Sequence, residues 1–485
     1  MDSRLFLRPN KIGLIVLLFI VVQSVVFGYT TFDNSQYLSL YVSSTQGNDN
    51  NDGMSVDKPF KTIRKAIQKT RIGKLCIRLK CGDVFFENIT GLSDCIIESY
   101  GKGDKPVLCG FKILKRPDAW QTDSVKGIWR LDLRNEADFT GYPLEYASDK
   151  CCFNNIGCIY DSRNDKIYGH LVKSKGALKS NGDIFTSSVY KRKDAEAEFR
   201  YLYLKYDQHP KALGNICLST YNHGISNMDR CVIRNIAIIG FARHGICGIN
   251  HTQVQNCDID IIGGSIQVGY QNWVRYGNGI ECWVLSSLIS DNTISHCSIS
   301  RTYDCGATIQ GKGKDLQNPC RIRFVHNKFI YCRQAFEHFL SDTEGKDVDY
   351  VDCEFSNNLC FMMGRNQFDS PEARDADLLS YDKKNKNILI SNNIFYGAPY
   401  YCGKAFGILK GNIVYIYKGD YLNHYHGQKN YPIIYANDEK SIETYRRRTH
   451  DDSRIYILDK ESDFDRKMKK KLLARIAYQP IRLKK

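Results

Sequence analysis

The sequence predicts an all-β solenoid, because one short phrase recurs between residues 231 and 395. In each copy, alternating apolar and polar residues lead to an asparagine, and an apolar pair follows. The copies carry Asn235, Asn256, Asn292, Asn327, Asn358 and Asn393. A strand that recurs with a turn-forming asparagine at variable intervals is typical of stacked coils with inserted loops. We expect these asparagines to stack at the turns as part of the scaffold.

The composition supports this class and suggests a charged partner. The chain has 485 residues, with 31 tyrosines and 37 glycines that suit strands and turns better than a helical bundle. Its formal net charge is +15, from 68 Lys and Arg against 53 Asp and Glu. A positive field of this size favours an acidic polysaccharide, a nucleic acid or a membrane surface. The basic stretches at 446–448 and 466–485 are equally consistent with solvated surface.

The first 28 residues have the pattern of a signal peptide. Arg4, Arg8 and Lys11 precede an apolar run, and small residues suited to signal peptidase follow it. The run is short for a membrane span, although an uncleaved anchor is the alternative. We therefore expect an exported protein, in the periplasm, on the cell surface or secreted, with a membrane contact only through this segment if it is uncleaved.

Nineteen cysteines in an exported chain would normally suggest disulfides, but their positions favour another interpretation. Cys297 and Cys332 each follow a repeat asparagine by the same offset, which predicts small buried side chains stacked in adjacent coils. Cys247, Cys282 and Cys305 occupy similar places in another strand. No pair of CxxC motifs is present, so we expect no structural zinc.

The opening of the chain carries a recognisable order of motifs. YVS is followed by a G-x-D-x-N-D-G turn and by PFKTI-x-KA, in which Ile63, Ala66 and Ile67 have helical spacing. This order resembles the start of exported right-handed parallel β-helix proteins of the pectate lyase-like group. The resemblance implies a short amphipathic helix that caps the N-terminal end. The turn residues Asp49, Asn51 and Asp52 could bind calcium or form a solvated turn.

The expected organisation follows from these patterns. Residues 1–28 form the signal peptide and residues 41–410 the parallel β-helix, with an irregular β insertion at about 111–225. Residues 411–485 form a C-terminal β extension and a basic tail. Within the tail, a short helix could cover the C-terminal end of the solenoid, or the segment could be disordered.

A second strand follows each repeat and places acids on one face. Aligned, these strands are HGICGI, NGIECW, CGATIQ and QAFEHF, which begin at residues 244, 278, 305 and 334. Alternation turns one set of residues inward: Ile280, Cys282, Ala307, Ile309 and Phe336. It turns another set outward: Glu281, Trp283, Thr308, Gln310, Glu337 and Phe339. We expect Glu281 and Glu337 to lie about 10 Å apart, measured between backbones, on one exposed column with Thr308 between them.

Carboxylates flanked by aromatic rings suit a carbohydrate ligand, because rings pack on sugars and carboxylates bind hydroxyls or transfer protons. The candidate catalytic residues are Glu281, Glu337, Arg333, Asp304 and Tyr303. The candidate substrate-binding residues are Trp283, Arg275, Thr308, Gln310, Phe339 and Arg365. We expect no metal ligand among them. The structural alternatives are a surface role for each glutamate and a core position for His338.

The phrases RYGNGIECW, YDCGATIQG and CRQAFEHF resemble those of uncharacterised bacterial β-helix proteins found among polysaccharide-processing proteins. We expect a carbohydrate-active protein that acts on an anionic polysaccharide, most simply a lyase, which needs a cation and a base near a uronate. A glycoside hydrolase and a uronate epimerase are alternatives, since the predicted separation of the two glutamates also suits an inverting hydrolase. A non-catalytic polysaccharide-binding or surface-polymer assembly protein is the other class. We expect a monomer without specific nucleic-acid binding.

Overall fold

The structure is a computed structural model that describes most of the chain. It covers residues 36–69, 74–150, 152–189, 198–268, 274–341, 343–365, 367–368, 375–381, 386–403, 407–424, 433–481 and 483. The segment expected to be a signal peptide, residues 1–28, lies outside these residues. In the described part of the chain, no helix is both long and apolar enough to cross a lipid bilayer.

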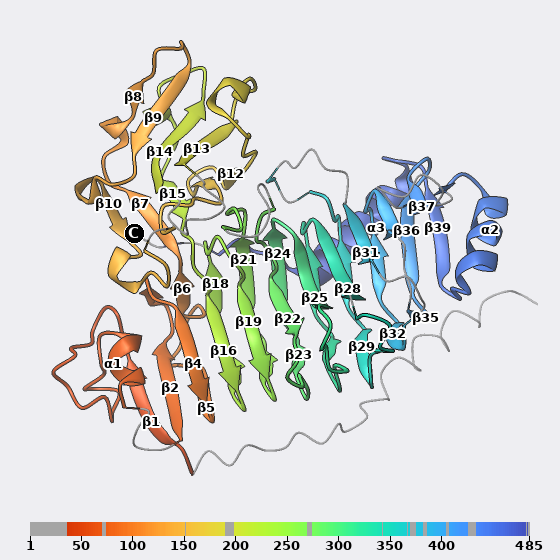
Figure 1. Cartoon of the computed structure of the whole chain (residues 1–485), viewed down its shortest axis with the longest axis horizontal. Coiled ribbons are helices and arrows are strands. Elements are labelled where there is room, and N and C mark those ends of the chain that lie inside the picture. The colour runs from red at the N-terminus through yellow and green to blue at the C-terminus, as the bar shows by residue number, and fades with distance from the viewer. Residues whose placement is uncertain are drawn as a thin grey trace, which may run out of the picture. The chain divides into compact units, whose positions relative to one another are not determined.

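Three long sheets form the right-handed parallel β-helix that the sequence predicts (Figure 1). Sheet A contains β1 (Leu38–Val42), β2 (Leu75–Lys80), β5 (Cys95–Tyr100), β17 (Val232–Arg234), β20 (Gln253–Gln255), β23 (Thr293–Ser295), β26 (Arg323–Val325), β29 (Cys353–Ser356), β32 (Ile388–Ser391) and β35 (Ile408–Lys410). Sheet B contains β3 (Val84–Phe85), β6 (Val107–Cys109), β18 (Ala237–Ile239), β21 (Asp258–Ile262), β24 (Ser298–Thr302), β27 (Lys328–Ile330), β30 (Leu359–Phe361), β33 (Ile394–Tyr396), β36 (Ile413–Tyr417) and β39 (Arg454–Leu458). Sheet C contains β4 (Ile89–Ser93), β16 (Ile225–Asp229), β19 (Ile246–Asn250), β22 (Ile280–Val284), β25 (Cys305–Lys312), β28 (Gln334–Ser341), β31 (Ala376–Ser380), β34 (Tyr400–Gly403), β37 (Tyr421–Asn423) and β38 (Ile434–Tyr435), of which the last pairs antiparallel.

The interior of the helix is a continuous apolar core that receives side chains from all three sheets. Successive residues of a strand point to opposite faces, so every second side chain enters it. The sequence predicts five inward residues on sheet C, and all of them lie in this core: Ile280, Cys282, Ala307, Ile309 and Phe336. The alternation read from the sequence is therefore confirmed for this sheet.

Asparagines at the turn between sheets A and B form a buried ladder. Asn327, Asn358, Asn393 and Asn412 each accept a hydrogen bond, through the side-chain oxygen, from a backbone N–H of the preceding coil at 2.8–3.0 Å. Each side-chain NH₂ donates to a backbone carbonyl. Because the ladder satisfies backbone groups that the turn leaves unpaired, its role is structural.

Three of the six predicted asparagines occupy other places. Asn235 and Asn256 precede the ladder position by one residue, at φ 58° and 48°, where asparagine tolerates the left-handed conformation. Asn292 lies at another turn, where its amide bridges the N–H of Thr252 and the carbonyl of Ile249. The prediction of one ladder through all six is therefore wrong, because the repeated phrase does not distinguish two adjacent turn positions.

Two small antiparallel sheets lie beside the β-helix, between β6 and β16 in the sequence (Figure 1). One contains β10 (Phe139–Gly141), β7 (Phe111–Leu114), β15 (Ile216–Ser219), β11 (Ile159–Asp161) and β12 (Lys166–Tyr168). The other contains β13 (Ile184–Val189), β14 (Glu198–Lys205), β9 (Ile128–Asp132) and β8 (Gln121–Thr122). We call these two sheets the insert. They have an apolar cluster of their own, which makes the insert a second packed layer.

A buried ion pair joins the insert, sheet B and the C-terminal segment. Arg301 and Asp260, whose side chains are 1% and 2% exposed, form a salt bridge. The Arg301 guanidinium also donates to Asp165 of the insert at 2.6 Å, and the Tyr478 hydroxyl lies 3.4 Å from Asp260. One buried cation therefore holds together three segments that are far apart in the sequence.

Short helices cover both ends of the core. α1 (Ile63–Ile67) begins at the side-chain cap of Thr62 and buries Ile63 and Ala66 in the core next to β1, which confirms the predicted N-terminal cap. α2 (Glu439–Thr449) buries Ile442 and Tyr445 in the core at the other end (Figure 1). Both helices therefore shield core side chains that end coils would expose.

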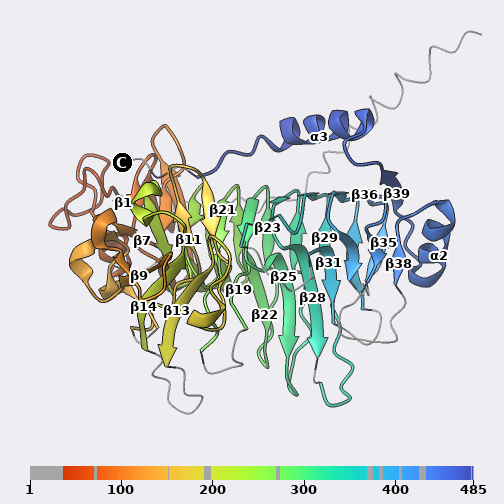
Figure 2. The same cartoon turned by 90° about the horizontal axis from the view of Figure 1, so that it is seen from above.

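The helix of the basic tail lies elsewhere than predicted. α3 (Asp463–Ile476) runs along the outside of the β-helix, as Figure 2 shows. Leu472 and Ile476 pack against the outer face of sheet B, on a cluster that includes Tyr396 and Tyr417. The expectation that the tail covers the C-terminal end is wrong, because α2 already occupies that end and sheet B offers an apolar outer face.

The 18 cysteines among the described residues are free thiols. Cys297, Cys332 and Cys282 lie in the apolar core, as expected. Cys297 lies between β23 and β24 and Cys332 between β27 and β28, so the two do not stack as predicted. Cys247 and Cys305 are buried as expected, but on the outer side of sheet C, where Cys247 pairs in register with Glu281.

The buried carboxyl group of Asp377 should make the free energy of unfolding depend on pH. Its side chain is 2% exposed, one carboxyl oxygen has no hydrogen-bond partner among the described residues, and burial raises its pKa well above 3.8. The unfolded chain releases this proton from about pH 4 upward, whereas the folded chain keeps it. Its contribution to the unfolding free energy is therefore greatest at acid pH and falls by up to about 1.4 kcal/mol per pH unit until the folded pKa is reached.

Asp377→Asn is expected to remove this slope, because the amide does not ionise. Denaturant unfolding of wild type and variant between about pH 4.5 and 7 measures the difference. Asp315→Asn is the control, since the Asp315 side chain is 76% exposed and should leave the slope unchanged. Parallel curves for wild type and Asp377→Asn would contradict the prediction.

Candidate functional site

The outward column of sheet C has the predicted register. Glu281 pairs with Thr308 and Thr308 with Glu337, while the next outward position aligns Trp283, Gln310 and Phe339. The two glutamates are 9% and 6% exposed. The prediction of an exposed column is therefore corrected: it faces outward but is largely covered.

Glu281 is held by three donors. Its Oε2 accepts from the Asn278 side chain at 2.8 Å and from Gln310 at 3.4 Å, and it lies 3.3 Å from His244 Nε2. The backbone N–H of Asn278 donates to His244 Nδ1, so the proton of the neutral ring is on Nε2 and points to Glu281. Burial lowers the pKa of His244, against an opposing effect of Glu281. Glu281 is therefore a fixed hydrogen-bond acceptor.

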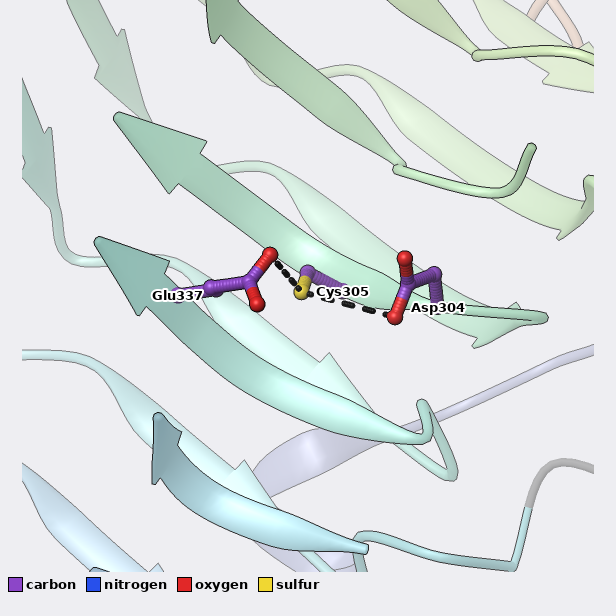
Figure 3. A group of neighbouring side chains, drawn as sticks. All are labelled: Asp304, Cys305 and Glu337. Atoms are coloured by element: carbon purple, nitrogen blue, oxygen red, sulfur yellow. Dashed lines mark hydrogen bonds between the residues drawn. The ribbon is translucent and has the colours of Figure 1, made fainter. Parts of the chain in front are cut away.

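A second cluster places two carboxyl groups close together. Cys305 begins β25 (Asp304 directly precedes it), and Glu337 comes from the neighbouring β28 (Figure 3). One donor atom from each residue lies within 4.8 Å of the other two. The Cys305 thiol lies between the carboxyl groups, 3.8 Å from Asp304 and 3.4 Å from Glu337. Burial and the two acids raise the thiol pKa, so Cys305 is a neutral donor there.

The predicted cations have different surroundings. The Arg275 guanidinium donates to the backbone carbonyls of Gly264, Gly157 and Gly169, which gives it a structural role between β-helix and insert. Arg333 Nε lies 3.7 Å from an oxygen of Asp375. The two guanidinium carbons lie 4.0 and 5.7 Å from the ring centre of Tyr303. Tyr303 thus packs against two cations.

Two rings form one side of the column. The rings of Trp283 and Phe339 meet edge to face with centres 6.4 Å apart, and Tyr381 packs on Phe339 at 5.5 Å. Beside them, Thr308 Oγ1 and Gln310 Oε1 are buried polar atoms without a hydrogen-bond partner in the described part of the chain. Buried polar atoms are normally paired, so a water or a ligand hydroxyl at this place would satisfy these two.

A second row of side chains hydrogen-bonds from coil to coil at the first position of the aligned sheet C segments, and the sequence did not predict it. The residues are His223, His244, Asn278, Cys305 and Gln334. Side-chain atoms of the first three accept from the backbone N–H one coil later, and the Cys305 thiol donates to Gln334 at 2.8 Å. The signal was present, because this position is polar in every aligned strand. Arg365, by contrast, lies away from the column, at the rim of a cavity.

Two groups of acids could hold a cation. Asp304, Cys305 and Glu337 have the spacing of metal ligands. In the turn considered for calcium, Asp49 accepts hydrogen bonds from the backbone N–H groups of Lys61 and Thr62. This carboxylate already binds the two residues that precede the first helical residue of α1, which accounts for its position in the turn.

No family model matches the sequence, and no curated protein matches it. Three solved structures have a similar architecture at low identity. XylC in complex with xylose is 11% identical over 86% of this chain and 82% of its own, with a TM-score of 0.44. The GH136 lacto-N-biosidase from Eubacterium ramulus is 11% identical over 87% and 68%, with a TM-score of 0.36. PfbA, a surface adhesin of Streptococcus pneumoniae, is 11% identical over 78% and 86%, with a TM-score of 0.33.

Proposed function

We propose that the protein hydrolyses a glycosidic bond in a polysaccharide, with Asp304 and Glu337 as the acting pair. The observation that carries the proposal is the approach of their carboxyl groups to within 4.8 Å on the outer face of sheet C. Retaining glycosidases use two carboxyl groups about 5–5.5 Å apart, one as nucleophile and one as proton donor. The unpaired atoms of Thr308 and Gln310 lie in register beside Glu337 and Phe339, where a sugar hydroxyl could satisfy them.

The arrangement favours hydrolysis over elimination. A lyase needs a cation that neutralises the uronate carboxylate at the reacting carbon. The Arg275 donors are used by backbone carbonyls, and Arg333 lies beside Asp375. A pair of acids needs no such cation, because proton donation to the leaving oxygen and attack on the anomeric carbon are both carboxyl chemistry.

Each of the other site residues has a supporting role in this proposal. Glu281, fixed by Asn278 and His244, accepts a sugar hydroxyl, and the ring of Trp283 packs on a sugar face. The neutral Cys305 thiol donates to Gln334 and packs 3.4 Å from Glu337, which helps to hold that carboxyl group in place. An export signal at residues 1–28 would place the enzyme where it meets polysaccharide.

The carboxyl separation predicts retention of the anomeric configuration. Proton NMR of the first sugar released, recorded before mutarotation, reports that configuration directly. A product with the same configuration as the substrate is expected. An inverted product would contradict the Asp304–Glu337 assignment and favour Glu281 and Glu337, which lie two strands and about 10 Å apart along the sheet.

A non-catalytic binding protein is the other class that the column supports, because Trp283 and Phe339 suit sugar rings without any reaction. In that case the wild type and the acid-pair variants would bind a polysaccharide equally, and none of them would release reducing ends. Binding by affinity electrophoresis, measured beside reducing-end release, separates the two functions.

A further inference from the structure

A cavity of about 490 Å³ opens between the insert and the β-helix. One wall is formed by the end of β12 and the turn before β13, including Lys166, His170 and Asp183. The facing wall comes from the loop after β30 and includes Arg365 and Asp375. A volume of this size accommodates one or two sugar rings, and most of the lining side chains are polar.

The insert wall holds an oriented imidazole. His170 Nδ1 lies 2.7 Å from Asp183 Oδ1, and Asp183 Oδ2 accepts from the backbone N–H groups of Lys179 and Ser180. Burial alone would raise the pKa of Asp183, but these three donors lower it. The Asp183 carboxylate therefore holds the Nδ1–H of His170 and leaves the other ring nitrogen, Nε2, turned away from Asp183.

The cavity rim carries positive charge. Lys166 from the insert and Arg365 from the facing loop are both exposed side chains. Of the two lining acids, Asp183 already binds His170, and Asp375 lies 3.7 Å from Arg333. Lys166 and Arg365 can therefore both donate to an anionic group, and the +15 net charge of the chain attracts such a group.

The cavity is connected to the acid pair through two arginines. Arg275 donates to the carbonyl of Gly169, which lines the cavity, and packs over Tyr303, the residue before Asp304. Arg333 contacts Asp375 of the cavity and directly precedes β28, the strand that carries Glu337. Arg275 and Arg333 therefore lie between the cavity and the acid pair and link the two places through direct contacts.

We propose that this cavity is a sugar subsite that selects an anionic residue of the polymer, a uronate or a sulfated sugar. Arg365 and Lys166 bind the anionic group, and His170, oriented by Asp183, binds a hydroxyl of the same sugar. The subsite rests on the proposed function, since it assigns the substrate class of that same site. It adds that specificity comes from the insert and from the loop after β30, away from the cleaved bond.

Binding by the Glu337→Gln variant tests the subsite without cleavage. Isothermal titration calorimetry would compare three tetrasaccharides: a polygalacturonate fragment, a carrageenan fragment and cellotetraose. The first carries carboxylates, the second sulfates and the third no charge. We expect one of the charged tetrasaccharides to bind at least about tenfold more tightly than cellotetraose, and the preferred one identifies the anionic group.

In that background, Arg365→Gln and Lys166→Gln are each expected to weaken binding of the preferred tetrasaccharide by about tenfold and to leave cellotetraose unchanged. Arg448→Gln and Lys410→Gln are the matched controls, because these exposed side chains lie on α2 and β35, outside the cavity lining. Equal affinity for all three sugars, or equal effects of cavity and control variants, would overturn the subsite. Those results would leave the proposed hydrolysis untouched. Selective binding of a charged tetrasaccharide, together with no hydrolysis by the wild type, would overturn the proposed reaction and leave the subsite standing.

Discussion

Glu337→Gln and Asp304→Asn are each expected to lower the rate of glycoside hydrolysis by about 10²- to 10⁴-fold, the usual contribution of a positioned acid or base. One carboxyl oxygen of Asp304 lies within 4.8 Å of a carboxyl oxygen of Glu337, close enough for the two groups to act on one bond. Each amide keeps the size of the side chain but neither attacks nor donates a proton as an acid does. Initial rates on aryl glycosides measure the loss.

The two variants should differ in a way that assigns their roles. A variant without the proton donor keeps more activity on an aryl glycoside with a good leaving group, since that bond needs little protonation. A variant without the nucleophile loses activity on every substrate, because the covalent intermediate does not form. Equal losses on good and poor leaving groups by both variants would contradict this division.

Glu354→Gln is the matched control for charge and size. Glu354 lies on β29 of sheet A, with Arg323 at 3.2 Å, and should retain wild-type turnover. A second control is a chelator, because Asp304, Cys305 and Glu337 also have metal-ligand spacing. An unchanged rate in EDTA supports acid–base chemistry by the pair, and a reversible loss restored by a divalent cation would contradict it.

Asp260→Ala is expected to lower the free energy of unfolding by about 3–5 kcal/mol, because it leaves the Arg301 charge buried without its main partner. The two side chains are 2% and 1% exposed, so water does not replace the lost contact. The effect should reach the insert and the tail as well, since Arg301 also contacts Asp165 and Tyr478 contacts Asp260. Chemical denaturation followed by circular dichroism measures the change.

Asp258→Ala provides the comparison on the same strand. Asp258 is 39% exposed and forms a surface ion pair with Lys105 at 3.0 Å, so its removal should cost at most about 1 kcal/mol. Similar losses for the two variants would contradict the view that the buried pair holds the three segments together.

Strand alternation explains why part of the site could be predicted from the sequence. A period of two fixes which side chains leave the core, and stacked coils turn a repeat offset into neighbouring positions. The alignment of Glu281, Thr308 and Glu337 follows from these rules and is confirmed by the strand register. The same rule placed Ile280 and Phe336 in the core.

The remaining features depend on contacts that alternation does not specify. Cys305 is the first residue after a turn, where strand alternation does not yet fix the direction of a side chain. Its thiol therefore points to Glu337, although its position in the sequence resembles that of the core cysteines. The cavity lies between the insert and the loop after β30, and neither segment has a repeat that could be aligned. The place of α3 depends on the outer face of sheet B, which the inward pattern leaves undefined.

The most direct test of the central claim is the product formed from anionic polysaccharides. Hydrolysis by the acid pair predicts reducing ends without the ultraviolet absorbance of an unsaturated uronate, and it predicts that Glu337→Gln releases far fewer of them. Reducing ends accompanied by that absorbance would show elimination and contradict the assignment of Asp304 and Glu337 as a hydrolytic pair.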